Sequence, residues 1–97
     1  MKKNFKWGII GTGGIANAFA NDLQYLKNHV VESVLSRNME NAKKFSSKYK
    51  SCKPFDKEQL FLTNRNIDAI YIATPNTLHA HQSIKSLQHR IPVLCEK

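Results

Sequence analysis

The fold of this chain is decided by the stretch WGIIGTGGIANAF, residues 7–19. It holds three of the chain's four glycines within four positions, at Gly11, Gly13 and Gly14. A short apolar run precedes them over residues 5–10, as in a strand that is buried on both faces. After them, apolar residues recur at the spacing of one helix face: Ile15, Phe19, Leu23 and Leu26. The pattern predicts a strand, a glycine turn and a helix.

The same alternation of strand and helix continues along the next thirty residues. A β-branched run over residues 30–35 predicts a second strand, and the residues SRN that follow end it. Asn38 is the expected N-cap of a second helix, because its side chain can accept a hydrogen bond from the first helical turn. Apolar residues spaced three and four apart predict the buried face of that helix: Ala42, Phe45 and Tyr49.

The second half of the chain is predicted to add three more strands. The segment around Lys53 is a weak strand whose proline suits only a sheet edge, and Asp56 is expected to cap a short helix after it. Strands are predicted over residues 67–73 and 91–95, with a helix over residues 78–88 between them. The apolar positions of the two helices are Leu60 and Phe61 in the first, and Ala80, Ile84 and Leu87 in the second. This order implies an α/β fold with a doubly wound parallel sheet.

Composition limits the classes of function. The 15 Lys and Arg residues exceed the 7 Asp and Glu residues by a formal charge of +8, which favours an anionic partner. The basic residues form no dense block, so nucleic acid is not the expected partner. With no apolar run near the roughly 20 residues of a membrane span and no secretory signal pattern, we expect a cytoplasmic protein without membrane contact. Cys52 and Cys95 show no metal-ligand spacing, so we expect buried thiols and no metal site.

The glycines match the pattern by which a strand-to-helix turn binds a pyrophosphate. Gly11 permits the tight turn, Gly13 lets the main chain approach the phosphates, and Ala16 is the third small position, where the helix packs on the strand. The free amides and the positive end of the helix dipole would hold the anion. The motif alone is weak evidence. Its place between a strand and an amphipathic helix favours dinucleotide binding.

The residues after the second predicted strand favour NADP over NAD as the cofactor. An NAD site usually presents Asp or Glu about 20 residues after the glycines, whereas this chain has Ser36 and Arg37 there. A guanidinium can pair with the 2′-phosphate through two parallel donors. NAD stays open as the alternative cofactor, because Arg37 could also be an ordinary solvated residue before a helix cap.

Four stretches together resemble one protein family: KWGIIGTGGIA, SRNMENAKKF, NIDAIYIATPNTLHAHQSI and VLCEK. They are similar to the N-terminal dinucleotide domain of the glucose-fructose oxidoreductase and inositol dehydrogenase family, often called Gfo/Idh/MocA. The resemblance covers essentially the whole chain. It implies a Rossmann-like sheet with five strands in the order 3-2-1-4-5. It also implies an oxidoreductase that acts on CH–OH groups of sugars, inositols or diols by hydride transfer with NAD or NADP.

The resemblance further implies which residues form the site. The expected cofactor-binding residues are Gly11, Thr12, Gly13, Gly14, Ile15, Ser36, Arg37, Thr74, Asn76, His79, Glu96 and Lys97. Residues 11–15 would hold the pyrophosphate, and Ser36 with Arg37 the ribose of the adenosine. The segment TPNTLH would lie beside the nicotinamide ribose. Glu96 and Lys97 match the first two positions of the family's E-K-P motif, whose lysine is the expected catalytic residue because an ammonium can stabilise a developing alkoxide.

Two positions depart from this site or lie beside it. Arg90 falls where the family commonly has a glycine after the fourth helix, and glycine there would end the helix in a left-handed conformation. Because of this departure, the resemblance does not determine the path of the loop after the helix. His81 lies two residues from His79, too close for both to face one metal from a helix, so we interpret it as a histidine of the helix surface.

Residues 1–97 are expected to be one dinucleotide-binding domain, incomplete, with the family's C-terminal substrate domain absent. Cofactor binding without turnover is therefore expected, with a sugar- or polyol-like substrate in the full-length protein. A homodimer is expected through the open edge of residues 91–95 or through the face that the missing domain would cover. Two alternatives stay open: a nucleotide-sensing module without catalysis, and a basic nucleic-acid binder around an inert core.

Overall fold

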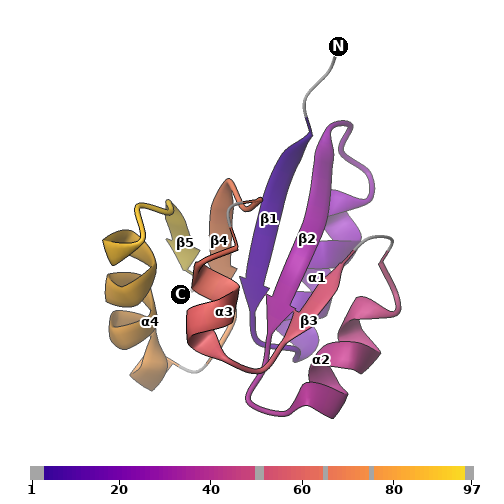
Figure 1. Cartoon of the computed structure of the whole chain (residues 1–97). Coiled ribbons are helices and arrows are strands. Elements are labelled where there is room, and N and C mark those ends of the chain that lie inside the picture. The colour runs from indigo at the N-terminus through magenta and orange to yellow at the C-terminus, as the bar shows by residue number, and fades with distance from the viewer. Residues whose placement is uncertain (1–3, 50–51, 65, 75, 96–97) are drawn as a thin grey trace.

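The central element of the fold is a strand that ends at the glycine turn. In the computed structural model, which describes residues 4–49, 52–64, 66–74 and 76–95, strands and helices alternate along the chain (Figure 1). In chain order the elements are β1 (Phe5–Ile10), α1 (Gly14–Leu23), β2 (His29–Leu35), α2 (Met39–Ser46), β3 (Lys53–Phe55), α3 (Glu58–Leu62), β4 (Ala69–Ile72), α4 (Asn76–Gln88) and β5 (Val93–Cys95).

Over these described residues the strands form one parallel sheet in the order β3-β2-β1-β4-β5. The predicted fold class and strand order are confirmed. The chain builds outward from β1 to β3 on one side, then crosses back to add β4 and β5 on the other side. A crevice opens at such a crossing, between the carboxyl ends of the two strands from which the chain departs in opposite directions. Here that point lies between β1 and β4.

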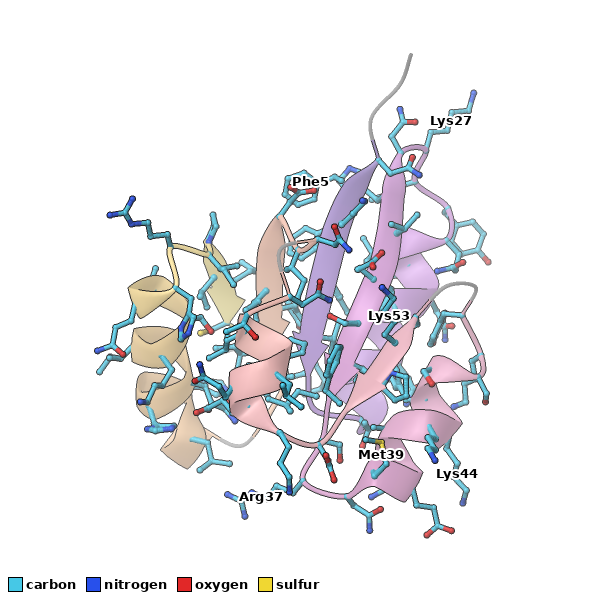
Figure 2. The ribbon with its side chains drawn as sticks, in the orientation of Figure 1. Phe5, Lys27, Arg37, Met39, Lys44 and Lys53 are labelled. Atoms are coloured by element: carbon cyan, nitrogen blue, oxygen red, sulfur yellow. The ribbon has the colours of Figure 1, made fainter. Side chains whose placement is uncertain are left out.

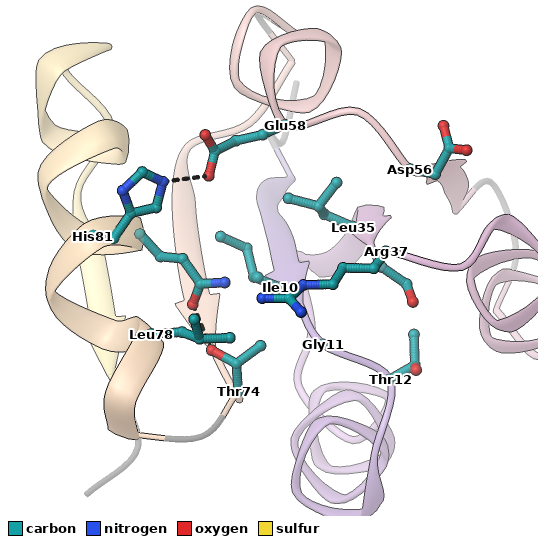
Figure 3. A pocket seen from close by; sticks show the side chains of 12 residues that line it. Ile10, Gly11, Thr12, Leu35, Arg37, Asp56, Glu58, Thr74, Leu78 and His81 are labelled. Atoms are coloured by element: carbon teal, nitrogen blue, oxygen red, sulfur yellow. Dashed lines mark hydrogen bonds and ion pairs between the residues drawn. The ribbon is translucent and has the colours of Figure 1, made fainter.

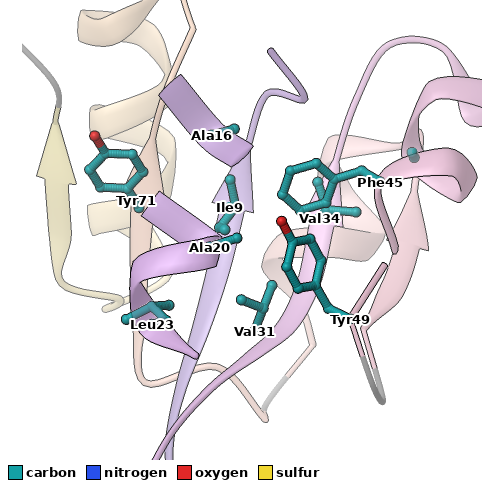
Figure 4. Close-up of a cluster of buried hydrophobic side chains, with 10 residues drawn as sticks. Ile9, Ala16, Ala20, Leu23, Val31, Val34, Phe45, Tyr49 and Tyr71 are labelled. Carbon is teal, nitrogen blue, oxygen red and sulfur yellow. The ribbon is translucent and has the colours of Figure 1, made fainter. Parts of the chain in front are cut away.

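The sheet separates two buried clusters because successive side chains of a strand point to opposite faces. Ile9 belongs to the cluster beneath α1 and α2, whereas its neighbour Ile10 belongs to the cluster beneath α3. Figure 4 shows the first cluster, in which Phe45 and Tyr49 pack beside Val34. Both faces of the central strands are therefore covered, which explains why β1 and β4 contain apolar runs instead of alternating with polar residues.

The buried face of α1 agrees only in part with the predicted one: Leu23 is buried and Phe19 packs partly buried against the first cluster. The helix ends at Leu23, so Leu26 lies beyond it and is 52% exposed, and Ile15 is 51% exposed. The face that meets the sheet carries Ala16, Ala20 and Leu23. Small side chains let the helix lie close to the sheet, and Ala16 is fully buried there, as predicted for the third small position of the turn.

The helix α4 begins two residues earlier than predicted and also presents a different face. Ile84 and Leu87 were expected to be buried, but they are 56% and 59% exposed, while Ser86 is fully buried. The Ser86 hydroxyl donates to the carbonyl of Gln82, which makes its burial possible. None of the described helices is both long and apolar enough to cross a membrane.

The two predicted helix caps have opposite outcomes. The side chain of Asn38 accepts a hydrogen bond from the N–H of Asn41 at 3.2 Å, so its role as the N-cap of α2 is confirmed. The prediction for Asp56 is wrong, because Lys57 is the N-cap of α3 and makes no capping bond with its side chain. Asp56 instead lies in the wall of a pocket.

Arg90 takes the backbone conformation that a glycine would take. Its φ of 60° is left-handed. The N–H of Arg90 donates to the carbonyl of Leu87 at 2.8 Å, and that of Ile91 to the carbonyl of Ser86 at 3.1 Å. These two bonds form the Schellman motif, in which glycine is preferred because an L side chain is strained there. The loop thus follows the path that a glycine would give it, and Arg90 bears the strain.

We expect Arg90→Gly to stabilise the fold by about 0.5–1 kcal/mol, because the strain of a left-handed L residue exceeds the added entropy of an unfolded glycine. Thermal unfolding should show a midpoint that rises by about 2–6 °C. Arg90→Ala is the matched control, since it removes the side chain but keeps the Cβ. Equal midpoints for the two variants would contradict this account.

Candidate functional site

A pocket of about 560 Å³ opens at the carboxyl ends of β1, β2 and β4, where the strand order reverses. Figure 3 shows it between α4 on one side and the turn that leads into α1 on the other. Its wall combines apolar strand ends with polar residues of the adjoining loops. The lining residues are Ile10, Gly11, Thr12, Leu35, Ser36, Arg37, Asp56, Glu58, Thr74, Leu78, His81 and Gln82.

Gly11 is required by both its backbone angle and its surroundings. Its φ is +110°, a conformation that L residues rarely adopt. A Cβ at this position would lie 3.0 Å from the carbonyl oxygen of Ala73 and 3.3 Å from Cγ2 of Thr74. The end of β4 therefore passes directly against the turn. Only a glycine lets the two come this close.

Gly13 and Gly14 have a different environment. A Cβ on either would meet no atom within 4 Å, so nothing in the described part of the chain excludes a side chain there. Gly13 is the N-cap of α1, and Gly14 is the first residue of that helix. The N–H groups of a first helical turn have no partner inside the helix, and the dipole makes this end positive. The turn is thus open toward solvent and suited to bind an anion.

Ser36 and Arg37 lie at the end of β2 on the pocket wall. The N–H of Ser36 donates to the carbonyl of Phe55 at 3.0 Å, and its hydroxyl accepts from the N–H of Asn38 at 3.2 Å. These bonds fix the backbone that carries Arg37. Figure 3 shows the Arg37 side chain extending into the pocket, where its guanidinium is free to meet an anionic ligand.

Among the described residues, the lysines labelled in Figure 2 lie far apart on different elements. Figure 2 shows Lys27 at the end of the molecule opposite Arg37, with Lys44 and Lys53 on other elements. Near the pocket, Arg37 is accompanied by two acids, Asp56 and Glu58. The pocket therefore offers one guanidinium and the amides of the turn to a ligand, rather than a cluster of lysines.

The wall formed by α4 is a network of polar side chains. The Thr74 hydroxyl hydrogen-bonds to the side-chain oxygen of Gln82, and Nε2 of His79 to the carbonyl oxygen of Thr74. Nε2 of His81 lies 3.5 Å from a carboxylate oxygen of Glu58, which links α4 to α3 across the rim. The segment after β4 is thereby held against the start of α4.

The structure brings together most of the predicted site residues that it describes. Gly11, Thr12, Ser36, Arg37 and Thr74 line the pocket. Residues 13–15 lie at the start of α1, directly after the pocket-lining Thr12. His79 contacts Thr74 without lining the pocket, and Asn76 is the first residue of α4. Glu96 and Lys97, including the predicted catalytic lysine, lie outside the described residues.

Several lining residues are not among the site residues that the sequence predicts: Asp56, Glu58, Leu78, His81 and Gln82. Asp56 and Glu58 come soon after β3, and the rule that ligands bind at the carboxyl ends of parallel strands could have found them. His81 was interpreted only as a surface histidine. It is exposed, but it also pairs with Glu58 at the rim.

The shifted acidities lie outside the pocket. Burial raises the pKa of the Cys52 thiol from 9.0 to about 12, and the nearby Glu32 carboxylate adds to the rise. Burial also raises the pKa of Tyr49. Both groups stay protonated at neutral pH, so Cys52 is not a nucleophile there. Among the described residues, no group of three or more His, Cys, Asp or Glu side chains could hold a metal ion.

Comparison with known proteins identifies the family. The model of an oxidoreductase family with an NAD-binding Rossmann fold, GFO_IDH_MocA, matches residues 5–97. The chain belongs to this family. The resemblance to the Gfo/Idh/MocA family is thereby confirmed, and with it the expectation of an NAD(P)-binding Rossmann domain.

Individual relatives agree with this assignment. The scyllo-inositol 2-dehydrogenase (NADP(+)) IolU of Bacillus subtilis is 34% identical over 92 residues, which are 95% of this chain and 28% of that protein. Glucose-6-phosphate 3-dehydrogenase of the same organism is 36% identical over 95 residues, 95% of this chain and 25% of that protein. KijD10, a 3-ketoreductase from Actinomadura kijaniata solved with NADP, has a TM-score of 0.90 at 28% identity, covering 98% of this chain and 30% of that chain. The chain thus spans about a quarter to a third of their lengths.

The two kinds of glycine predict different effects of alanine on the family's site. Gly11→Ala should destabilise the fold by about 1–3 kcal/mol, because its φ and the contact with Ala73 are both unfavourable for a Cβ. Gly13→Ala should cost less than about 1 kcal/mol, as expected for alanine at an N-cap, yet weaken cofactor binding by filling the space at the turn. Denaturant unfolding and cofactor titration measure the two effects. The distinction fails if Gly13→Ala unfolds as readily as Gly11→Ala, or binds cofactor normally.

Proposed function

We propose that this chain is the cofactor-binding part of an oxidoreductase that transfers a hydride between NADP and a CH–OH group of a sugar, inositol or diol. The observation that carries the proposal is the open glycine turn at the reversal of strand order, with Arg37 beside it. In this reaction the alcohol loses a hydride to the nicotinamide and a proton to a base, giving a carbonyl group and NADPH. The names of the relatives, an inositol dehydrogenase and a sugar-phosphate dehydrogenase among them, support the substrate class.

NADP is the preferred cofactor because of the two residues at the end of β2. A carboxylate at this place would repel the 2′-phosphate, whereas the chain has Ser36 and Arg37. The guanidinium reaches into the pocket and can donate two parallel hydrogen bonds to a phosphate. IolU is named for NADP(+), and KijD10 was solved with NADP, which supports the same choice.

The nicotinamide end is proposed to lie along the segment after β4. Thr74 lines the pocket and His79 binds its carbonyl, so both are close enough to shape this end. Asn76, Glu96 and Lys97 are assigned here by their match to the family's motifs. Lys97 is the proposed catalytic residue, with its ammonium stabilising the alkoxide that develops as the hydroxyl proton leaves.

For residues 1–97 by themselves we propose cofactor binding without turnover. Hydride transfer needs the substrate carbon held at about 3–3.5 Å from the nicotinamide with a proton acceptor in place. The family resemblance assigns those groups to a second domain that binds the sugar or polyol. The proposed location is the cytoplasm.

Replacing Arg37 tests the cofactor assignment. Arg37→Ala should weaken NADP binding about 10- to 100-fold, the loss expected for a charge-assisted pair of hydrogen bonds, and change NAD binding by less than about twofold. Calorimetric titration of both nucleotides gives the dissociation constants. Lys43→Ala, which removes an exposed cation from α2 away from the pocket, is the matched control. If the wild-type chain binds neither nucleotide, the proposed function is wrong. If Arg37→Ala weakens the binding of NADP and NAD equally, only the proposed preference for NADP is wrong.

We also propose that the edge strand β5 mediates a homodimer. Within the described sheet, β5 pairs with β4 alone, and Leu94 is 49% exposed. An edge strand presents unpaired backbone groups that a second strand can satisfy. Leu94→Lys should shift the chain to a monomer in sedimentation velocity, whereas Leu87→Lys, at an exposed apolar position of α4, should not. A wild-type chain that sediments as a monomer at high concentration would overturn this proposal.

A further inference from the structure

Asn17 is a polar residue of the first helical turns whose side chain folds back onto the glycine turn. Its Nδ2 donates to the carbonyl oxygens of Thr12 at 3.2 Å and Gly13 at 3.0 Å. Its Oδ1 faces the other way and accepts from Nζ of Lys48 at 3.2 Å. The hydroxyl of Tyr49 lies 3.5 Å from the same oxygen. One side chain therefore joins the turn to the end of α2.

The partners fix the orientation of the Asn17 amide. Backbone carbonyls can only accept hydrogen bonds, and an ammonium can only donate them. The amide nitrogen must therefore face Thr12 and Gly13, while the amide oxygen must face Lys48. In the flipped orientation the amide oxygen would face the two carbonyl oxygens and the amide NH2 would face the ammonium, so both contacts would be repulsive.

The two carbonyls that Asn17 holds determine where two N–H groups point. A peptide unit is planar and trans, so the N–H of Gly13 points opposite to the carbonyl of Thr12. The N–H of Gly14 likewise points opposite to the carbonyl of Gly13. With both carbonyls turned toward Asn17, both N–H groups are turned away from it. The surroundings of Gly13 and Gly14 are open on their Cβ side, so a ligand has room beside them.

The two carbonyls differ in how they are held. The Gly13 carbonyl also accepts the first main-chain bond of α1, from the N–H of Asn17 at 3.0 Å, whereas the Thr12 carbonyl is held by the Asn17 side chain. Glycine populates right- and left-handed backbone conformations about equally, so without this side chain the peptide between Thr12 and Gly13 could rotate at little cost. Tyr49 adds rigidity here, because it is buried in the cluster beneath α2 (Figure 4). Its single hydroxyl proton lies between two acceptors, Oδ1 of Asn21 at 3.1 Å and Oδ1 of Asn17 at 3.5 Å. The turn is thereby tied to the packed core through Asn17.

Charge around this contact also suits an anion. A small cavity of about 150 Å³ between the turn and α2 is lined by Thr12, Asn17, Asn41, Lys44, Phe45 and Lys48. Two lysines thus approach the turn from the side of α2. The Lys48 ammonium both holds Asn17 and adds positive potential near the N-terminus of α1.

We propose that Asn17 is a positioning residue that fixes the N–H groups of Gly13 and Gly14 for the pyrophosphate of the cofactor, with α2 as its support. The proposal rests on the proposed function, and it adds a residue that the glycine motif does not contain. Asn17 does not touch the cofactor in this role. It acts by holding the two peptide planes to which these N–H groups belong.

Asn17→Asp tests the proposal with little change in shape. The carboxylate keeps an oxygen for Lys48 and Tyr49 but replaces the donor to Thr12 and Gly13 with an oxygen that repels both carbonyls. Asn21→Asp is the matched control, because it adds the same charge one turn further along α1 and can still accept from Tyr49. Each variant is titrated with NADP and with adenosine 2′-monophosphate, which has the Arg37 end but no pyrophosphate. NMR titration measures both affinities, and thermal unfolding checks the fold.

Asn17→Asp should bind NADP about 10- to 100-fold more weakly than the wild type and adenosine 2′-monophosphate within about twofold of it, while Asn21→Asp should bind both within about threefold. The proposal is overturned if Asn17→Asp binds NADP as Asn21→Asp does, or if it loses both ligands equally, which would indicate general loss of structure. Lys48→Met should weaken NADP binding less than Asn17→Asp does. Failure of the wild-type chain to bind NADP would instead refute the proposed function, and the inference with it.

Discussion

The structure depends on how the end of β1 passes between its two neighbours. The N–H of Gly11 donates to the carbonyl of Leu35 at 2.9 Å, and the carbonyl of Ile10 accepts from the N–H of Ala73 at 2.9 Å. These bonds hold the turn against β2 and β4 together. A Cβ on Gly11 would collide with the Ala73 carbonyl, so the contact requires glycine. The pocket exists at this point because the chain leaves the sheet through a residue without a side chain.

The remaining glycines of the turn are not required by the contacts of the fold. No described atom approaches the Cβ positions of Gly13 and Gly14, so the fold alone would accept alanine at either. The main-chain N–H of Asn17 already holds the carbonyl of Gly13, but glycine leaves the peptide before Gly13 free to rotate. The amide of Asn17 offsets this by holding two carbonyls from the side of the packed helices. In its proposed role, Asn17 lies outside the glycine motif and holds the backbone of the turn, while the space beside the glycines stays open.

The order of elements could be predicted from the sequence because hydrophobic period, turn residues and the cap at Asn38 are local signals. The face by which α1 meets the sheet could not. Ile15 is more hydrophobic than Ala16, yet Ala16 is buried, because close approach of helix and strand selects small side chains. Likewise, Asp56 and His81 reach the pocket through the packing of α3 and α4 over the strand ends. No local pattern encodes that packing. The sequence therefore predicts a helix cap at Asp56 and a surface histidine at His81.

Selectivity between the two nicotinamide cofactors cannot arise at the glycine turn, because both cofactors carry the same pyrophosphate. In the proposed binding mode it comes from side chains around the adenosine ribose, just beyond β2 and β3. Arg37 lies beyond β2, the strand next to the turn, whereas Asp56 lies beyond β3, one strand further out. Interaction between charges falls with distance and is screened at an exposed site, so the nearer group dominates. The guanidinium therefore outweighs the carboxylate for a phosphate bound beside the turn.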